Sequence, residues 1–142
     1  MITLGGITRL TQSGLSMTNW KFTGSLPPLN DNEWLLEFEN YKTSPEFKLV
    51  NKHYEVGDFK QIFWWEYSHR ALGRIIGLTF IIPLLYFYFG RKMDKRFTFK
   101  ALIALGLIIS QGLLGWIMVK SGLNKAPHVN HFLLASHLLL AI

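Results

Sequence analysis

A glutamate and a histidine three residues apart are the first residues in this chain whose types and spacing could do chemistry. Glu66 and His69 lie in the stretch Glu-Tyr-Ser-His-Arg, and residues at this spacing are neighbours on one face of a helix. Gly73 and Gly77 continue that face in four-residue steps, and glycines beside a histidine leave space for a large flat group against the backbone. The alternative interpretation is a Gly-x-x-x-Gly helix-packing motif, with Glu66 paired to Arg70 one turn on.

His137 supplies a second imidazole at a similar depth. It lies eight residues after Val129, where the last apolar run begins, which is roughly 12 Å along a helix. His69 lies seven residues after Ile62, roughly 10 Å in from the same side. Two histidines at matched depth on different helices are what a haem held in a helix bundle requires, whereas zinc requires three or four ligands. A satisfied polar histidine in a helix interface is the alternative for either residue alone.

The elements that must position these residues are long apolar helices. Residues 71–90 contain one charge, Arg74, and residues 101–119 contain none, so each run covers roughly the 30 Å of a bilayer core. A third run occupies residues 129–142, and residues 1–7 read as the tail of another apolar helix. Ionisable residues at membrane depth are costly and indicate a functional site. We therefore expect an all-α, polytopic transmembrane helical bundle, truncated inside a helix at both ends.

These runs divide the chain into six parts. The expected parts are the tail of a first span (1–7), an outer segment (8–57), a second span (58–90), an inner basic loop (91–98), a third span (99–120) and the start of a fourth span (128–142). Asn30 with Glu33, and Asp58 with Gln61, are plausible helix caps. His128 and His131 are expected at the surface near the mouth of the fourth span, and His53 in solvent.

Charge distribution predicts orientation and argues against nucleic acid as a partner. The net charge is +6, but residues 91–100 hold five basic residues and one acid, while residues 21–60 hold five basic and seven acidic residues. The positive-inside rule puts the short basic loop in the cytoplasm or matrix and the long segment outside, with the lipid bilayer as the surrounding partner. The absence of cysteine excludes a disulfide, a thiolate-ligated haem, an iron–sulfur cluster and covalent c-type haem within these residues.

Five sequence blocks, in order over nearly the whole chain, carry a family resemblance. They are GGITRLTQSGLS (5–16), PEFK (45–48), EYSHR followed by GR (66–74), QGLLGWIMVKSG (111–122) and ASH (135–137). With these blocks the chain resembles the N-terminal half of the haem A synthase family, in the cysteine-free branch of mitochondria and alphaproteobacteria. The resemblance implies an oxidoreductase of haem biosynthesis in the bacterial inner membrane or the mitochondrial inner membrane.

The resemblance also implies an architecture and a reaction. The family has eight spans in two four-helix halves, the first forming the substrate haem pocket and the second holding a haem b cofactor. One methyl group of haem O is oxidised by two successive hydroxylations to a gem-diol, which loses water to give the formyl group of haem A for cytochrome oxidase. His69 and His137 would then be the ligands of the substrate haem iron, and Glu66 would be the catalytic carboxylate.

Three arginines are candidates to pair with the haem propionates, namely Arg9, Arg70 and Arg74. The alternative is that they orient the helices at the membrane interface, with Arg9 simply a charge of the outer loop. Candidate partners besides haem O are haem O synthase, oxidase assembly proteins and a second copy of the chain.

Two other functions compete with the enzyme. The first is a bis-histidine cytochrome b-type electron-transfer membrane subunit, which would gain nothing from an acid beside its ligand. The second is a transporter or assembly factor with a haem conduit, which would not need two ligands at one depth.

Overall fold

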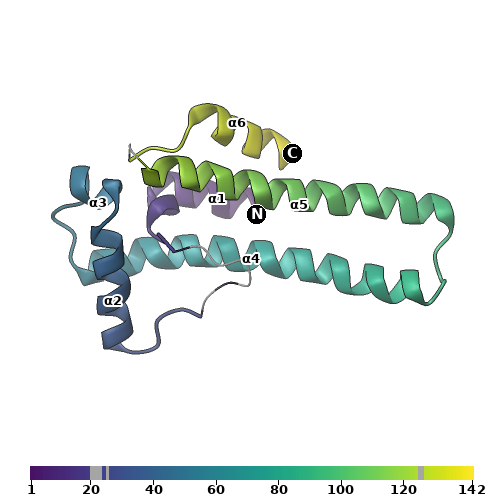
Figure 1. Cartoon of the computed structure of the whole chain (residues 1–142), viewed down its shortest axis with the longest axis horizontal. Helices are drawn as coiled ribbons and strands as arrows, with labels where there is room; N and C mark the ends of the chain where they lie inside the picture. The colour runs from purple at the N-terminus through teal and green to yellow at the C-terminus, as the bar shows by residue number, and fades with distance from the viewer. Residues whose placement is uncertain (20–23, 25, 125–126) are drawn as a thin grey trace.

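The computed structural model describes residues 1–19, 24, 26–124 and 127–142, and in these residues the fold is all-α. Its elements are α1 (Ile2–Leu10), a 3₁₀ turn η1 (Ser13–Leu15), α2 (Asp31–Lys42), α3 (Pro45–Leu49), α4 (Val56–Phe89), α5 (Lys95–Asn124) and α6 (His131–Leu140). Figure 1 shows α4 and α5 as the long axis of the molecule, with α2 and α3 gathered at one end.

The two expected full spans are present as an antiparallel pair. α4 has 34 residues and α5 has 30, and both are long and apolar enough to cross a membrane. They run in opposite directions on either side of a short turn at residues 90–94 (Figure 1). Only 6% of the most apolar window of α4, and none of that of α5, is buried inside the protein. The apolar side chains therefore face outward, as lipid-facing helices require and as the core helix of a water-soluble protein does not.

Both long helices begin earlier than the apolar runs indicate, because polar caps extend them. α5 begins at Lys95 rather than at position 99, since Asp94 Oδ1 accepts a hydrogen bond from Phe97 N at 2.6 Å. Half of the expected basic loop 91–98 is consequently helical. α4 begins at Val56, where Asp58 Oδ2 accepts from Glu55 N at 3.0 Å. Asp58 is thus the third residue of the helix and not its cap, which corrects the expected start at position 58.

The shorter helices differ slightly from their expected bounds. α1 continues to Leu10, beyond the expected end at position 7. α6 begins at His131 because Asn130 Oδ1 accepts from Phe132 N at 2.9 Å. The expected cap of α2 is confirmed, since Asn30 Oδ1 accepts from Glu33 N at 2.9 Å.

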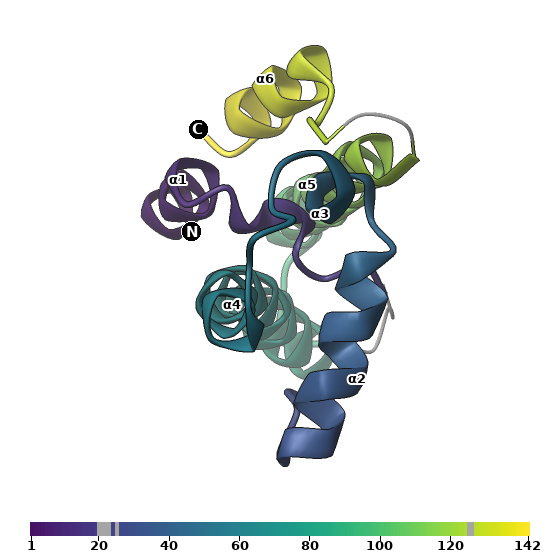
Figure 2. The ribbon, with the colours of Figure 1, turned by 90° about the vertical axis from the view of Figure 1, so that its left-hand side faces the viewer.

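An aromatic core fixes the outer segment onto the beginning of α4. Trp34, Phe38 and Tyr41 of α2 pack against Phe59 and Phe63 of α4, and all five are buried. The rings of Tyr41 and Phe59 stack with centroids 5.1 Å apart, and those of Trp34 and Phe63 meet edge to face at 5.1 Å. Figures 1 and 2 show α2 lying across this end of α4. The core includes Phe63, one turn before Glu66, and therefore anchors the helix next to the candidate site.

The remaining helices close around the same end of the long pair. α1 packs on α4, α6 packs on α5, and η1 contacts both long helices (Figure 2). Leu15 of η1 occupies the space beside Gly122 of α5, where an added Cβ would lie only 2.9 Å from Leu15 Cδ2. The chain segment between α1 and η1 is thereby held over the part of α4 that carries Glu66.

Candidate functional site

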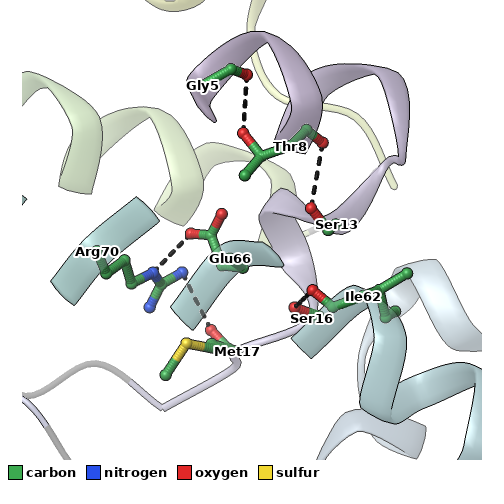
Figure 3. Close-up of polar contacts among 8 residues, drawn as sticks. All are labelled: Gly5, Thr8, Ser13, Ser16, Met17, Ile62, Glu66 and Arg70. Atoms are coloured by element: carbon green, nitrogen blue, oxygen red, sulfur yellow. Dashed lines mark hydrogen bonds and ion pairs between the residues drawn. The ribbon is translucent and has the colours of Figure 1, made fainter. Parts of the chain in front are cut away.

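Glu66 is buried in α4 and forms an ion pair with the arginine one turn further along. Arg70 Nε donates to Glu66 Oε1 at 2.6 Å, and both side chains are shielded from solvent. Arg70 Nη2 also donates to the carbonyl oxygen of Met17 at 3.4 Å, as Figure 3 shows. The arginine therefore joins the carboxylate to the segment that follows η1. This pairing was the alternative that the sequence left open for Glu66.

A corner of hydroxyl-bearing residues between α1 and α4 covers the carboxylate. Thr8 Oγ1 donates to the Gly5 carbonyl at 2.8 Å, Ser13 Oγ donates to the Thr8 carbonyl at 3.3 Å, and Ser16 Oγ donates to the Ile62 carbonyl at 3.3 Å (Figure 3). These bonds satisfy buried hydroxyl groups within the corner itself. Glu66, beneath this corner, is only 3% exposed.

Each of the two candidate histidine ligands lies against a glycine of a neighbouring helix. A Cβ added at Gly5 of α1 would stand 3.4 Å from Nε2 of His69. A Cβ added at Gly115 of α5 would stand 2.9 Å from Cε1 of His137 and 3.5 Å from both of its ring nitrogens. Real Cβ atoms essentially never make the 2.9 Å contact, so the His137 ring occupies space that only a glycine leaves open.

A glutamine of α5 holds the backbone and ring of His137. Gln111 Nε2 donates to the His137 carbonyl at 3.0 Å and lies 3.4 Å from His137 Nε2. This hydrogen bond joins α5 to α6. His137 Nδ1 and Gln111 Oε1 are buried without any hydrogen-bond partner. Such orphaned polar atoms carry a free-energy cost and call for a further partner in the working protein.

The donor set fits a haem between two imidazoles better than a zinc ion. Among the described residues, no group of three His, Cys, Asp or Glu side chains is placed to hold a metal ion. The glycines beside both rings leave room for a flat group, and the two imidazoles are nitrogen ligands that a haem iron would accept.

The three candidate propionate arginines occupy different surroundings. Arg9 is exposed near the end of α1. Arg70 is engaged by Glu66 and by the Met17 carbonyl. Arg74 is partly buried and lies against Gly24, where an added Cβ would be 3.3 Å from the Arg74 guanidinium carbon. Arg70 and Arg74 are four residues apart and therefore share one face of α4.

The other histidines lie at the surface, as expected. His128 and His131 are exposed around the start of α6. His53 is exposed and meets the Tyr54 ring edge to face at 5.0 Å. No reactive role is assigned to these three side chains.

Glu46 is a second buried carboxylate, and the sequence did not indicate that it is buried. Glu46 Oε2 accepts from Tyr41 OH at 2.9 Å, and Asn51 Nδ2 donates to the same tyrosine oxygen at 2.8 Å. Burial raises the pKa of Glu46 from 4.5 to about 7; the Tyr41 hydrogen bond opposes the rise and the charge of Glu66 adds to it. Burial also raises the pKa of Tyr41 above its ordinary value. A glutamate after proline in a first helical turn usually faces solvent, so no sequence signal distinguishes this one.

The comparisons with known proteins cover the entire chain. The COX15-CtaA family model, described as cytochrome oxidase assembly protein, matches residues 1–142. The chain is 48% identical over 143 residues to the "Heme A synthase" of Ehrlichia canis, covering 100% of this chain and 41% of that protein. It is 50% identical over 144 residues to the "Heme A synthase" of Flavobacterium psychrophilum, covering 99% of this chain and 42% of that protein.

A eukaryotic relative matches equally well. The chain is 47% identical over 150 residues to a "Heme A synthase-mitochondrial ferredoxin fusion protein" of Schizosaccharomyces pombe, covering 100% of this chain and 24% of that protein. No solved structure matches the chain significantly. The chain spans about two fifths of the length of the first curated relatives that it matches. Because the family model matches every residue from 1 to 142, the chain belongs to the COX15-CtaA family of cytochrome oxidase assembly proteins.

Proposed function

We propose that this chain forms the substrate-binding half of a haem A synthase. In this proposal it holds haem O between His69 and His137, and Glu66 takes up a proton as a methyl group of the substrate is oxidised to a formyl group. The observation that carries the proposal is the position of Glu66, a buried carboxylate one helical turn from His69. The names of relatives 46–50% identical to the chain support the same reaction.

Each side chain of the site has a definite task in this mechanism. His69 and His137 would hold the substrate iron, and Gly5 and Gly115 give their rings room. Gln111 fixes His137 by binding its backbone carbonyl. When bound, the haem iron supplies the redox chemistry. Proton transfer falls to Glu66, the buried carboxylate nearest in sequence to a ligand.

Arg70 pairs with Glu66 and holds its carboxylate in place. A buried carboxylate without a counter-charge is costly, and the 2.6 Å contact with Arg70 offsets that cost. The second oxygen, Oε2, lies on the Gly14 side, where an added Cβ would be at the ordinary contact distance of 3.9 Å. One oxygen is therefore committed to the arginine while the other remains oriented toward the covering corner.

We also propose that the chain is one four-helix half of an eight-helix protein. α1 would be the end of a first span, α4 and α5 the second and third spans, and α6 the beginning of a fourth. The relatives, which are more than twice as long as this chain, support this division. By the positive-inside rule, the turn between α4 and α5 faces the cytoplasm or matrix, and α2 and α3 lie on the outer side.

One observation favours a second candidate function, a bis-histidine electron-transfer subunit. The ion pair with Arg70 gives Glu66 a structural role, which is all that an electron carrier would need from it. The two functions differ in whether the carboxylate is required for product formation once haem is bound.

Exchange of the carboxylate for an amide separates them. In the full-length protein, Glu66→Gln keeps an oxygen that can accept from Arg70, so haem binding is retained. Loss of a proton-transfer group should lower the conversion of haem O to haem A by about 10²–10⁴-fold. Extracted haems, separated by chromatography, give the product, and the optical spectrum gives bound haem. His69→Ala should lose both.

Arg70→Gln breaks the ion pair but leaves the carboxylate, so its comparison with Glu66→Gln separates loss of the pair from loss of the acid. If Glu66→Gln forms haem A at the normal rate, Glu66 is structural and the catalytic assignment is wrong. If the wild-type full-length protein binds haem but never converts haem O, the electron carrier is the better description.

A further inference from the structure

A groove at the turn between the two long helices has no part in the function proposed above. It is formed by the end of α4, the turn at residues 90–94 and the first two turns of α5, and its volume is about 690 Å³. Figure 1 shows this turn at the end of the helix pair opposite α2 and α3. The apolar part of its wall comes from both helices, with Tyr88 and Phe89 from α4 and Phe99 and Leu102 from α5.

The position of the groove is that of a membrane surface. Both helices are long and apolar enough to cross a membrane, and the groove lies where one ends and the other begins. Each of the four apolar wall residues is more than half exposed. Aromatic side chains at the ends of spanning helices lie at the level where hydrocarbon gives way to lipid headgroups. This part of the groove is therefore suited to contact with acyl chains.

Two cations line the same groove, Arg91 from the turn and Lys95 from the first position of α5. Both are exposed, and none of the three ion pairs between described residues includes either of them. The one acid in residues 91–100 is Asp94, whose Oδ1 accepts a hydrogen bond from Phe97 N at 2.6 Å. Among the described residues that line the groove none is acidic, so it combines positive charge with apolar surface.

Arg91 has a backbone conformation that is sterically unfavourable for any residue except glycine. Its φ is 52°, in the left-handed region. Lys92 N donates to the Phe87 carbonyl at 3.0 Å and Arg91 N to the Tyr88 carbonyl at 3.1 Å, the pattern that ends a helix at a left-handed residue, usually glycine. The glycine of this turn, Gly90, comes one position earlier, with a φ of −71°. The chain thus has a cation where a glycine would relieve strain, which points to a role for its side chain.

We propose that this groove binds an anionic phospholipid, with its phosphate held by Arg91 and Lys95 and its acyl chains along the apolar wall. Basic pockets between spanning helices bind anionic lipid headgroups, and a guanidinium group can pair with a phosphate through two hydrogen bonds. A free phosphate would use the two cations but leave the apolar wall uncovered, whereas a lipid uses both. The inference is independent of the proposed haem chemistry and requires only that α4 and α5 span the membrane.

The test measures binding of dioleoyl phosphatidylglycerol to the purified full-length protein in detergent, with bound lipid counted by native mass spectrometry. Arg91→Gly and Lys95→Gln each remove a cation that lines the groove, whereas Arg96→Gln removes an exposed cation of the same segment that does not line it. Each groove variant should bind about fivefold more weakly and the double variant about 30-fold, while Arg96→Gln should match the wild type. Because glycine suits the left-handed conformation, Arg91→Gly should unfold at the wild-type temperature or above it, which separates lost binding from misfolding.

Two further ligands identify which part of the lipid is bound. Dioleoyl phosphatidylcholine has the same chains without the net negative charge, and it should bind equally to the wild type and the double variant. Millimolar inorganic phosphate should not displace phosphatidylglycerol, whereas displacement would make the groove a site for free anions and overturn the proposal. Equal binding of phosphatidylglycerol by the wild type and the double variant would also overturn it, as it would if other parts of the full-length protein fill the groove. An equal loss in Arg96→Gln would show general attraction to the basic segment instead of a site.

Discussion

One added methyl group at Gly115 tests the placement of His137. The Cβ of Gly115→Ala would lie 2.9 Å from Cε1 of His137. Non-bonded carbon atoms prefer about 3.5–4.0 Å, so the ring must retreat by roughly 0.6–1.1 Å. It cannot retreat freely, because Gln111 Nε2 lies 3.4 Å from His137 Nε2 and binds the His137 carbonyl at 3.0 Å. The ring should therefore turn away from the position in which it can bind iron.

The magnitude follows from two opposing effects. Overpacking of this kind costs about 1–3 kcal/mol, whereas replacing a glycine by alanine inside a helix gains roughly 1 kcal/mol. The free energy of unfolding should consequently fall by no more than about 2 kcal/mol, and the protein still folds. Haem binding requires the original ring position, so the whole overpacking free energy of about 1–3 kcal/mol weakens binding. This corresponds to about a 5- to 150-fold loss of affinity.

The assay compares three alanine variants of the full-length protein by optical titration with haem. Gly112→Ala is the control, because no atom outside its own helix lies within 4 Å of the added Cβ. Gly5→Ala places a Cβ 3.4 Å from His69 Nε2, a contact that a small shift relieves. Affinity should fall most in Gly115→Ala, less in Gly5→Ala and not at all in Gly112→Ala. Equal affinities for Gly115→Ala and Gly112→Ala would refute the contact between Gly115 and a ligating His137.

Three further predictions concern the ion pair, the second acid and the orientation. Arg70→Met leaves the buried carboxylate of Glu66 without its cation and should destabilise the protein by about 3–5 kcal/mol. The double variant with Glu66→Gln should recover most of this stability. Thermal unfolding of the single and double variants measures both changes. Since burial raises the pKa of Glu46 from 4.5 to about 7, folding favours its protonated form. Its contribution to stability is complete below pH 4.5 and is lost as the pH rises through about 7. The loss amounts to roughly 3 kcal/mol, and hydrogen exchange of α2 and α3 in wild type and Glu46→Gln should differ in that range. A cysteine that replaces Met93 should not react with membrane-impermeant labels added to the outer side of sealed vesicles. A cysteine that replaces Leu36, which is exposed in α2, should react with them. The reverse pattern would contradict the orientation.

Much of the fold and part of the site could be predicted without a structure, because the signals are local. A run of about twenty apolar residues has few options besides a spanning helix, so α4 and α5 follow from composition. The pairing of Asn30 with Glu33 lies within one turn, and so does the shared face of Glu66 and His69. The ends of the helices could not be predicted as closely. Asp94 caps α5 through a single hydrogen bond, and the hydropathy of the sequence gives no sign of that bond.

The sequence by itself determined which residues belong to spanning helices and which ionisable side chains share a helical face with a histidine, since the helical period converts spacing directly into direction. The tertiary structure alone decided what meets across helices. It put Gly115 beside His137, closed the η1 corner over Glu66 and buried Glu46 against Tyr41. These contacts join residues far apart in the chain, and packing in three dimensions sets whether a side chain there is buried or solvated. Burial in turn sets whether a carboxylate is a surface charge or a group that exchanges protons near neutral pH.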